Sequence, residues 1–201
     1  MSDLKYPVIS ISREYAAYGR TIARALALEL GIPFFDKDFV KETAKKSGYT
    51  EEEVQAEGET ISQGSKILNS ILNNAMSYTS SHDEIFKAEA EVILELAQRP
   101  CIIVGRCSEA ILRTAEIPSL NVFLHASIED RIMHAAELPE NKGRDVKHEI
   151  VKWDKQRANF FKNYTGQEFG DYHNYDLVLD VGRLGVDKCV EIILEAEKLG
   201  E

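Results

Sequence analysis

A short segment between a β-branched run and an Ala/Leu-rich helix carries the residues best suited to bind phosphate. Residues 14–21 read Glu-Tyr-Ala-Ala-Tyr-Gly-Arg-Thr and align with the phosphate-binding pattern G-x-x-x-x-G-K-[ST]. Gly19 and Thr21 match it, whereas Glu14 replaces the first glycine and Arg20 replaces the lysine. At a loop-to-helix junction, unpaired backbone N–H groups and the positive end of the helix dipole favour phosphate. The match alone has low specificity, and Arg20 could equally be a surface arginine in a first helical turn.

Apolar patterning places this junction in a parallel sheet. The run at 6–11 is short and β-branched, as expected for a buried strand. Gly31 and Pro33 follow residues 20–30 where a helix should stop. Strands that alternate with helices imply a parallel sheet with helices on both faces, and ligands bind beyond the carboxyl ends of its strands. Further strands are expected at 101–105, 120–124 and 176–181, and helices at 108–114, 128–138, 141–162 and 186–199.

Size and composition narrow the class of protein. The 201 residues suffice for one domain, and 44% hydrophobic with 29% charged residues is ordinary for a globular protein. A net charge of -10 disfavours DNA and RNA as partners but permits a small phosphorylated ligand. No run approaches the roughly 18 apolar residues of a membrane helix, no signal peptide is visible, and the cysteines are widely spaced. We expect a cytoplasmic protein that binds neither nucleic acid nor membrane.

Several segments, in the same order along the chain, resemble the cytidylate kinase-like family. Residues 12–20, SREYAAYGR, are similar to the family's S-R-E-Y-G-S-G-G-R, and residues 31–37, GIPFFDK, are similar to its GIPYYDK. The resemblance covers nearly the whole chain and continues through residues 104–107, 121–131, 154–166 and 175–179. It implies an α/β, three-layer P-loop kinase fold with a parallel sheet and a helical insertion. The expected organisation is one domain, 1–201, with a helical nucleoside-monophosphate-binding insert at 48–98 and a lid-like region at 139–174.

The sequence also departs from the family pattern at several positions. Ala16-Ala17-Tyr18 stands where the family has Gly-Ser-Gly, and alanine and tyrosine resist the positive φ that turns backbone amides toward phosphate. Residues 104–107, Val-Gly-Arg-Cys, lack both acids of the D-G-R-D seen in true cytidylate kinases. His134 and Ile150 occupy positions where an arginine is usual. These changes favour weak or absent transfer activity.

On the donor side, the resemblance implies that the backbone of the loop and the Arg20 side chain hold the β-phosphate of ATP. Thr21 would orient Mg²⁺, with Asp36 or Asp38 supplying a carboxylate. Asp36 could instead cap the following helix. The phosphate-binding residues implied are Tyr15, Ala16, Ala17, Tyr18, Gly19, Arg20 and Thr21.

On the acceptor side, the resemblance assigns Arg106 to the phosphate of the acceptor and Arg131 to the donor phosphates. Asp154 and Arg157 match a D-x-x-R that contacts the acceptor nucleotide. With Arg20, the three arginines form the implied catalytic set. The alternatives are a structural ion pair for Arg106, and for Asp154 and Arg157 a surface pair worth a few tenths of a kcal/mol.

Together these features predict a nucleoside-monophosphate kinase-like phosphotransferase that uses ATP and Mg²⁺. The alternative is a nucleotide- or phosphate-binding protein that is catalytically weak or inactive. A third alternative, a purely structural or dimerisation protein, is disfavoured because it would not explain why these arginines occur together. Apolar stripes between residues 61 and 96 could pack onto the domain or form a homodimer surface.

Overall fold

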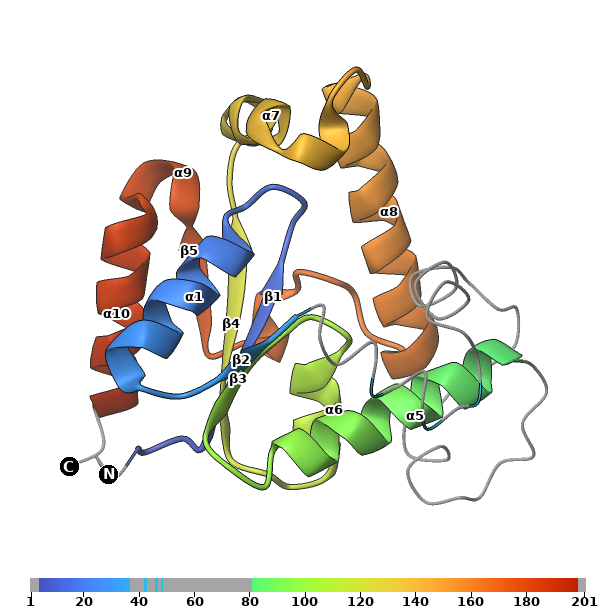
Figure 1. Ribbon diagram of the computed structural model, residues 1–201, viewed down its shortest axis with the longest axis vertical. Coiled ribbons are helices and arrows are strands. Elements are labelled where there is room, and N and C mark those ends of the chain that lie inside the picture. Colours follow the sequence, from blue (N-terminus) through green and yellow to red (C-terminus); the bar gives the residue numbers. More distant parts are fainter. Residues whose placement is uncertain (1–3, 37–41, 43–45, 47, 49–80, 199–201) are drawn as a thin grey trace.

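Five parallel strands form the centre of the molecule (Figure 1). The computed structural model describes residues 4–36, 42, 46, 48 and 81–198. The strand order is β2-β3-β1-β4-β5, and every pairing is parallel, which confirms the predicted sheet. The strands are β1 Val8–Arg13, β2 Phe34–Phe35, β3 Cys101–Val104, β4 Ser119–His125 and β5 Leu177–Asp180.

Helices cover both faces of this sheet (Figure 1). One face carries α1 (Gly19–Leu30), α9 (Val181–Leu184) and α10 (Val186–Lys198). The other carries α5 (Ser81–Leu96), α6 (Ser108–Thr114) and α8 (Val146–Thr165). Helix α7 (Ile128–Glu137) lies beyond the carboxyl ends of the strands. Two single turns, η1 (Pro139–Asn141) and η2 (Tyr172–Asn174), complete the described elements.

The strand register brings separate segments to one edge of the sheet. Ile11 of β1 is level with Val104 of β3, and Arg13 is level with Leu124 of β4. The residues that follow β1 and β3 therefore emerge side by side at the carboxyl edge. This edge is where a parallel α/β sheet binds ligands.

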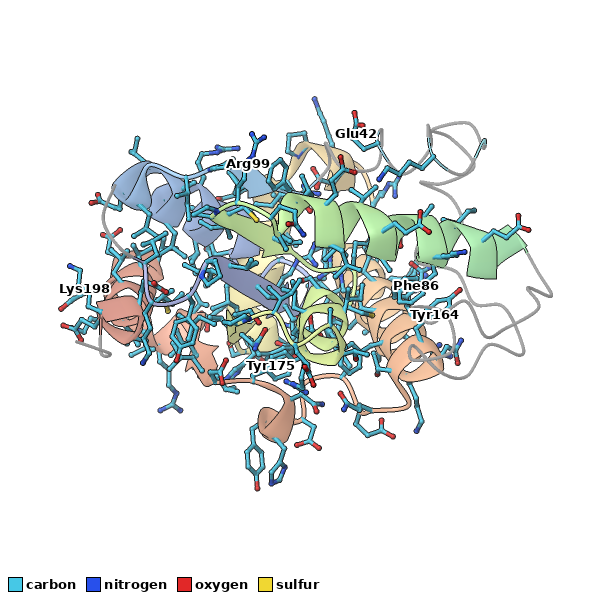
Figure 2. The ribbon with its side chains drawn as sticks, turned by 90° about the horizontal axis from the view of Figure 1, so that it is seen from below. Glu42, Phe86, Arg99, Tyr164, Tyr175 and Lys198 are labelled. Atoms are coloured by element: carbon cyan, nitrogen blue, oxygen red, sulfur yellow. The ribbon has the colours of Figure 1, made fainter. Side chains whose placement is uncertain are left out.

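Each face of the sheet has its own apolar core. Ile22 and Leu26 of α1 are fully buried against β1, β3 and β4, and burying one such side chain contributes about 1.5–3 kcal/mol. On the opposite face the rings of Phe86 and Tyr164 stack at 3.8 Å between α5 and α8 (Figure 2). The two cores fix the sheet between its helical layers.

A third apolar cluster lies beyond the carboxyl edge. Tyr15, Ala135 and Ile150 are its buried members, from the loop after β1, from α7 and from α8. Trp153 stacks on Tyr15 with the ring centroids 6.1 Å apart. The loop after β1 thus packs into α7 and α8, which belong to or adjoin the region predicted to be a lid.

Element boundaries differ from the sequence prediction mainly before α8. The predicted helix 141–162 begins later, at Val146, where the Oδ1 of Asp145 accepts a hydrogen bond from the N–H of His148 at 3.2 Å. Gly143, at φ 77°, separates this start from the turn η1. Of the predicted insert 48–98, residues 49–80 lie outside the described residues, so the insert stays a prediction. No helix in the described ranges is long and apolar enough to cross a membrane.

Candidate functional site

The loop between β1 and α1 follows a glycine-like path without the glycines. Ala16 has φ 61° and Tyr18 has φ 58°, both in the left-handed region. For residues with a side chain this conformation costs roughly 1–2 kcal/mol each. Alanine and tyrosine were expected to resist positive φ, yet both residues adopt it here, so other contacts must offset the cost.

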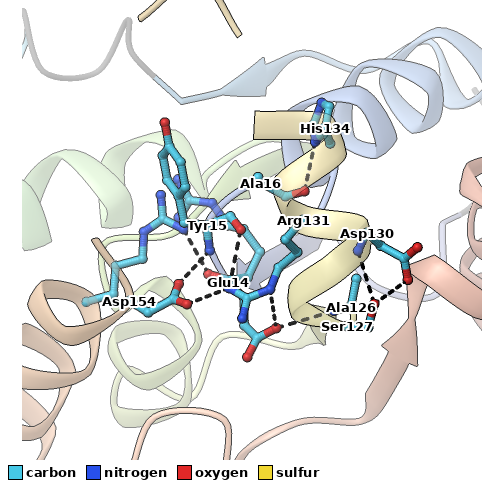
Figure 3. Close-up of polar contacts among 11 residues, drawn as sticks. Glu14, Tyr15, Ala16, Ala126, Ser127, Asp130, Arg131, His134 and Asp154 are labelled. Carbon is cyan, nitrogen blue, oxygen red and sulfur yellow. Dashed lines mark hydrogen bonds and ion pairs between the residues drawn. The ribbon is translucent and has the colours of Figure 1, made fainter. Parts of the chain in front are cut away.

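Side chains of α7 and α8 supply those contacts (Figure 3). The backbone N–H of Tyr15 donates to Asp154 Oδ1 at 2.7 Å, and Arg131 Nη1 donates to the Tyr15 carbonyl at 3.4 Å. His134 Nδ1 lies 2.7 Å from the carbonyl oxygen of Ala16. The loop is therefore shaped by the helices above it.

Two departures from the family pattern contact each other. The ring of Tyr18 stacks on that of His134, with centroids 3.7 Å apart and planes inclined by 7°. Tyr18 stands where the pattern has glycine, and His134 stands where it usually has arginine. This stacking contact joins the loop to α7 and favours the left-handed conformation of Tyr18. A glycine at position 18 would allow that conformation but could not make the contact.

Arg131 lies between two carboxylates. Its Nε is 3.3 Å from Glu14 Oε2 and its Nη1 is 2.5 Å from Asp154 Oδ2 (Figure 3). Glu14 Oε2 also accepts a hydrogen bond from the N–H of Ala126 at 3.3 Å. Burial raises the pKa of Glu14, and the charge of Arg131 opposes this rise. In this structure Arg131 and Asp154 bind the loop and each other, and only 8% of Arg131 is exposed.

The start of α1 is suited to an anion. Among the described residues no side chain caps this helix, and its first turn contains no acid. The N–H of Ile22 bonds to the carbonyl of Tyr18, so Gly19, Arg20 and Thr21 form the turn whose amides have no partner within the helix. The predicted donor-phosphate residues thus surround one helix N-terminus.

Asp36 lies between two guanidinium groups. Its Oδ2 contacts Arg20 Nε, and its Oδ1 is 3.7 Å from Arg13 Nη2. Arg20 Nη1 also lies 3.9 Å from Glu140 Oε1. A hydroxyl from Thr21 and a carboxylate from Asp36 are the oxygen ligands that Mg²⁺ prefers, so these residues fit the ion by donor type. The described residues contain no cluster of three or more His, Cys, Asp or Glu side chains, and Asp38 lies outside them.

A pocket opens at the carboxyl ends of β1 and β3. It is a small cavity of about 30 Å³ that opens to solvent. Arg106 Nη1 lies 3.3 Å from Oε1 of the fully buried Glu89, and Arg157 Nη1 donates to the Arg13 carbonyl at 3.1 Å. The pocket therefore brings together Arg106 and Arg157, which sequence reasoning paired with an acceptor. Its nine lining residues include Arg13, Arg106, Arg157, Phe160, Phe161 and Phe169.

The structure separates the predicted site residues into three groups. Arg20 and Thr21 lie at the start of α1, and Arg106 and Arg157 line the pocket. Asp154 faces the loop. Sequence reasoning assigned no role to Arg13, although two signals were available: its match to the family's S-R-E-Y segment and its position at the carboxyl end of β1.

A buried carboxyl group lies behind the pocket. The Oγ of Ser12, a lining residue, donates to Glu109 Oε2 at 3.1 Å, and only 1% of Glu109 is exposed. Burial raises the pKa of Glu109, opposed by its hydrogen bonds and by the charges of Arg113 and Arg13. The Oε1 of Glu109 and the hydroxyl of Tyr175 are buried without a hydrogen-bond partner among the described residues.

This burial predicts a pH effect on stability. Because the folded state binds the Glu109 proton more tightly than the unfolded state, the free energy of unfolding falls as pH rises above the ordinary value of 4.5. Glu109→Gln keeps a side chain of the same size and removes the ionisation. We expect it to be more stable than the native protein at pH 8, by about 1.4 kcal/mol for each unit by which burial raises the pKa of Glu109. The gain should shrink toward pH 4.

Urea unfolding between pH 4 and pH 8 measures this difference. Glu195→Gln, at an exposed position of α10, is the control and should show no such trend. A Glu109→Gln variant that loses stability equally at every pH would show that the ionised carboxylate is needed in the fold.

Comparison with known proteins agrees with this geometry. The model of the cytidylate kinase-like family matches residues 8–183. The chain belongs to the cytidylate kinase-like family. No curated protein matches the chain.

Solved structures show the same fold. An uncharacterised protein from Eubacterium ventriosum ATCC 27560 is 23% identical, with a TM-score of 0.68 over 95% of this chain and 98% of that one. A shikimate kinase from Bacteroides thetaiotaomicron is 15% identical, with a TM-score of 0.57 over 95% and 98%. A gluconokinase from Sinorhizobium meliloti 1021 is 13% identical, with a TM-score of 0.54 over 96% and 95%. The predicted α/β P-loop kinase fold is confirmed.

Proposed function

We propose that this protein transfers the γ-phosphoryl group of ATP to a small phosphorylated acceptor of the nucleoside-monophosphate class. The observation that carries the proposal is the meeting of two features at one edge of the sheet. The uncapped start of α1, with Arg20 beside it, suits the donor phosphates, and a pocket with three arginines suits the acceptor. Phosphoryl transfer depends mainly on positioning and charge neutralisation, which these groups provide.

The residues divide the work by location. The amides of Gly19, Arg20 and Thr21 bind the β-phosphate, and the Arg20 guanidinium neutralises its charge. Arg106 and Arg157 hold the acceptor with its phosphate toward the donor. Mg²⁺ bound with ATP would neutralise charge on the phosphates, and Thr21 would be its protein ligand. Asp36 could act as a second ligand only if it gave up its contact with Arg20 or Arg13. Arg131 and Asp154 keep the loop in its binding conformation.

The second candidate is a nucleotide- or phosphate-binding protein with little or no transfer activity. Its support is the arrangement of Arg131 and Asp154, which bind the loop and each other. The sequence Val-Gly-Arg-Cys at 104–107, which brings no acid to the end of β3, also favours it. A cytoplasmic location and a homodimer stay predictions.

Transfer from ATP and Mg²⁺ to a panel of nucleoside monophosphates tests the proposal. We expect one diphosphate product from the native protein and a rate about 10²–10³-fold lower for Arg20→Ala, the loss seen when a charge-stabilising donor is removed. Arg24→Ala, one turn along α1 and exposed, is the matched control and should retain the native rate. Nucleotide binding with no product above the Arg20→Ala background would favour the second candidate.

A further inference from the structure

We infer that Arg13 is a third anion-binding arginine of the pocket and makes it select a phosphomonoester dianion over a monoanionic carboxylate. Arg13 matches the arginine of the family's S-R-E-Y segment, but the resemblance assigns it no role. The inference rests on the proposed function for the identity of the acceptor, but binding alone can test it.

Two glycines leave room for the side chain of Arg13. Arg13 ends β1, and its carbonyl oxygen accepts a hydrogen bond from Arg157 Nη1 at 3.1 Å. A Cβ at Gly105 would lie 2.2 Å from Arg13 Nη1, and one at Gly19 would lie 2.9 Å from Arg13 Cγ. Glycine at these two positions therefore leaves the space that the Arg13 side chain occupies.

Asp36 orients the guanidinium at the end of this path. Arg13 Nη2 lies 3.7 Å from Asp36 Oδ1, and the two side chains are 14% and 11% exposed. A guanidinium carries five N–H donors, so this pair is compatible with binding ligand oxygens as well. Since Asp36 also contacts Arg20, the carboxylate lies between one arginine at the start of α1 and one in the pocket.

The charge of the pocket matches a dianion. Three arginines and no Asp or Glu occur among its nine lining residues, all of them in the described part of the chain. The carboxylates of Glu89 and Asp36 lie behind Arg106 and Arg13 and offset part of this positive charge. A phosphomonoester has three terminal oxygens and a charge of about −1.5 to −2 near pH 7, whereas a carboxylate has two oxygens and one charge. Arginine forks suit such oxygens geometrically. Phe160, Phe161 and Phe169 offer an apolar wall to the rest of the acceptor.

Binding of CMP, cytidine 5′-carboxylate and inorganic phosphate, measured by calorimetry without ATP, tests the inference. The carboxylate replaces the 5′-CH2–O–phosphate of CMP and is therefore also shorter, so inorganic phosphate, which has no linker, is included as the third ligand. The native protein should bind CMP more tightly than the carboxylate. Arg13→Gln should weaken CMP and phosphate by about 10- to 100-fold, as for loss of a hydrogen bond between charged groups. It should weaken the carboxylate by less than about threefold, so that the preference collapses. Arg13→Lys should restore part of it.

Controls show whether a loss of binding reflects misfolding, and they allow the inference and the kinase proposal to be tested separately. Arg144→Gln, at an exposed position paired with Glu149, should bind CMP like the native protein, and thermal unfolding checks that each variant folds. Equal loss of all three ligands in Arg13→Gln, or no binding of CMP and phosphate by the native protein, would overturn the inference. Arg13-dependent CMP binding without transfer from ATP would uphold it and reject the kinase. If the native protein transfers phosphate from ATP but Arg13→Gln binds CMP as tightly as the native protein, the kinase proposal is supported and the inference about Arg13 is rejected.

Discussion

Replacement of Arg131 by methionine should lower the free energy of unfolding by about 3 kcal/mol. Breaking a buried ion pair by removing one partner costs about 3–5 kcal/mol, because the remaining charge stays uncompensated. Arg131 Nε lies 3.3 Å from Glu14 Oε2, and its Nη1 lies 2.5 Å from Asp154 Oδ2. We expect the lower end of the range because the side chains of Glu14 and Asp154 are 30% and 26% exposed, so water can reach both.

Denaturant unfolding at pH 7 measures the loss, and Arg144→Met is the matched control. Arg144 is 54% exposed and lies 3.4 Å from Glu149 Oε2, so its removal should cost less than about 1 kcal/mol. Adding Glu14→Gln and Asp154→Asn to Arg131→Met removes the two stranded charges and should recover part of the loss. If Arg131→Met stays within about 1 kcal/mol of the native protein, the three side chains do not hold the loop as described.

Contacts of Asp154, Arg131 and His134 with the loop backbone explain how the loop keeps its shape. Glycine would allow Ala16 and Tyr18 their positive φ values without strain. Here that strain, roughly 1–2 kcal/mol per residue, is offset by Asp154, Arg131 and His134. The loop is thereby coupled to α7 and α8. Any movement of these helices would change the conformation of the loop between β1 and α1.

Local sequence signals predicted most of the fold. Gly31 ends α1 in a left-handed conformation, as its position before Pro33 indicated, and the helix predicted at 108–114 is α6. Apolar runs located β1, β3, β4 and β5 to within two residues. These features depend on spacings of a few residues, which a single sequence displays directly.

The candidate site was less predictable because its contacts join distant parts of the chain. Tyr18 and His134 each read as a defect in the family pattern, and only the fold shows that their rings stack. Asp154 matched a motif by spacing, but its contact with the N–H of Tyr15 spans 139 positions. Arg13 matched the family's S-R-E-Y segment, but the path of its side chain depends on space left at Gly19 and Gly105, which the motif does not display.

Gly105→Ala should abolish the contribution of Arg13 to CMP binding. It should lower the free energy of unfolding by little more than the backbone strain of an alanine at this position. Gly105 has φ 82°, where an alanine costs roughly 1–2 kcal/mol. The added Cβ would lie 2.2 Å from Arg13 Nη1, the far end of a flexible side chain that can swing away. We therefore expect CMP binding to weaken by about 10- to 100-fold, as in Arg13→Gln.

Gly31→Ala separates strain from displacement, because Gly31 has φ 65° and, beyond its chain neighbours, no described residue has an atom within 4 Å of an added Cβ. Both alanine variants should lose similar stability in denaturant unfolding, but only Gly105→Ala should lose CMP binding. In the Arg13→Gln background, Gly105→Ala should weaken CMP binding no further, since the side chain it displaces is already gone. Additive losses in the double variant would show that the two residues act independently, and Gly105 would then be needed for its backbone conformation alone.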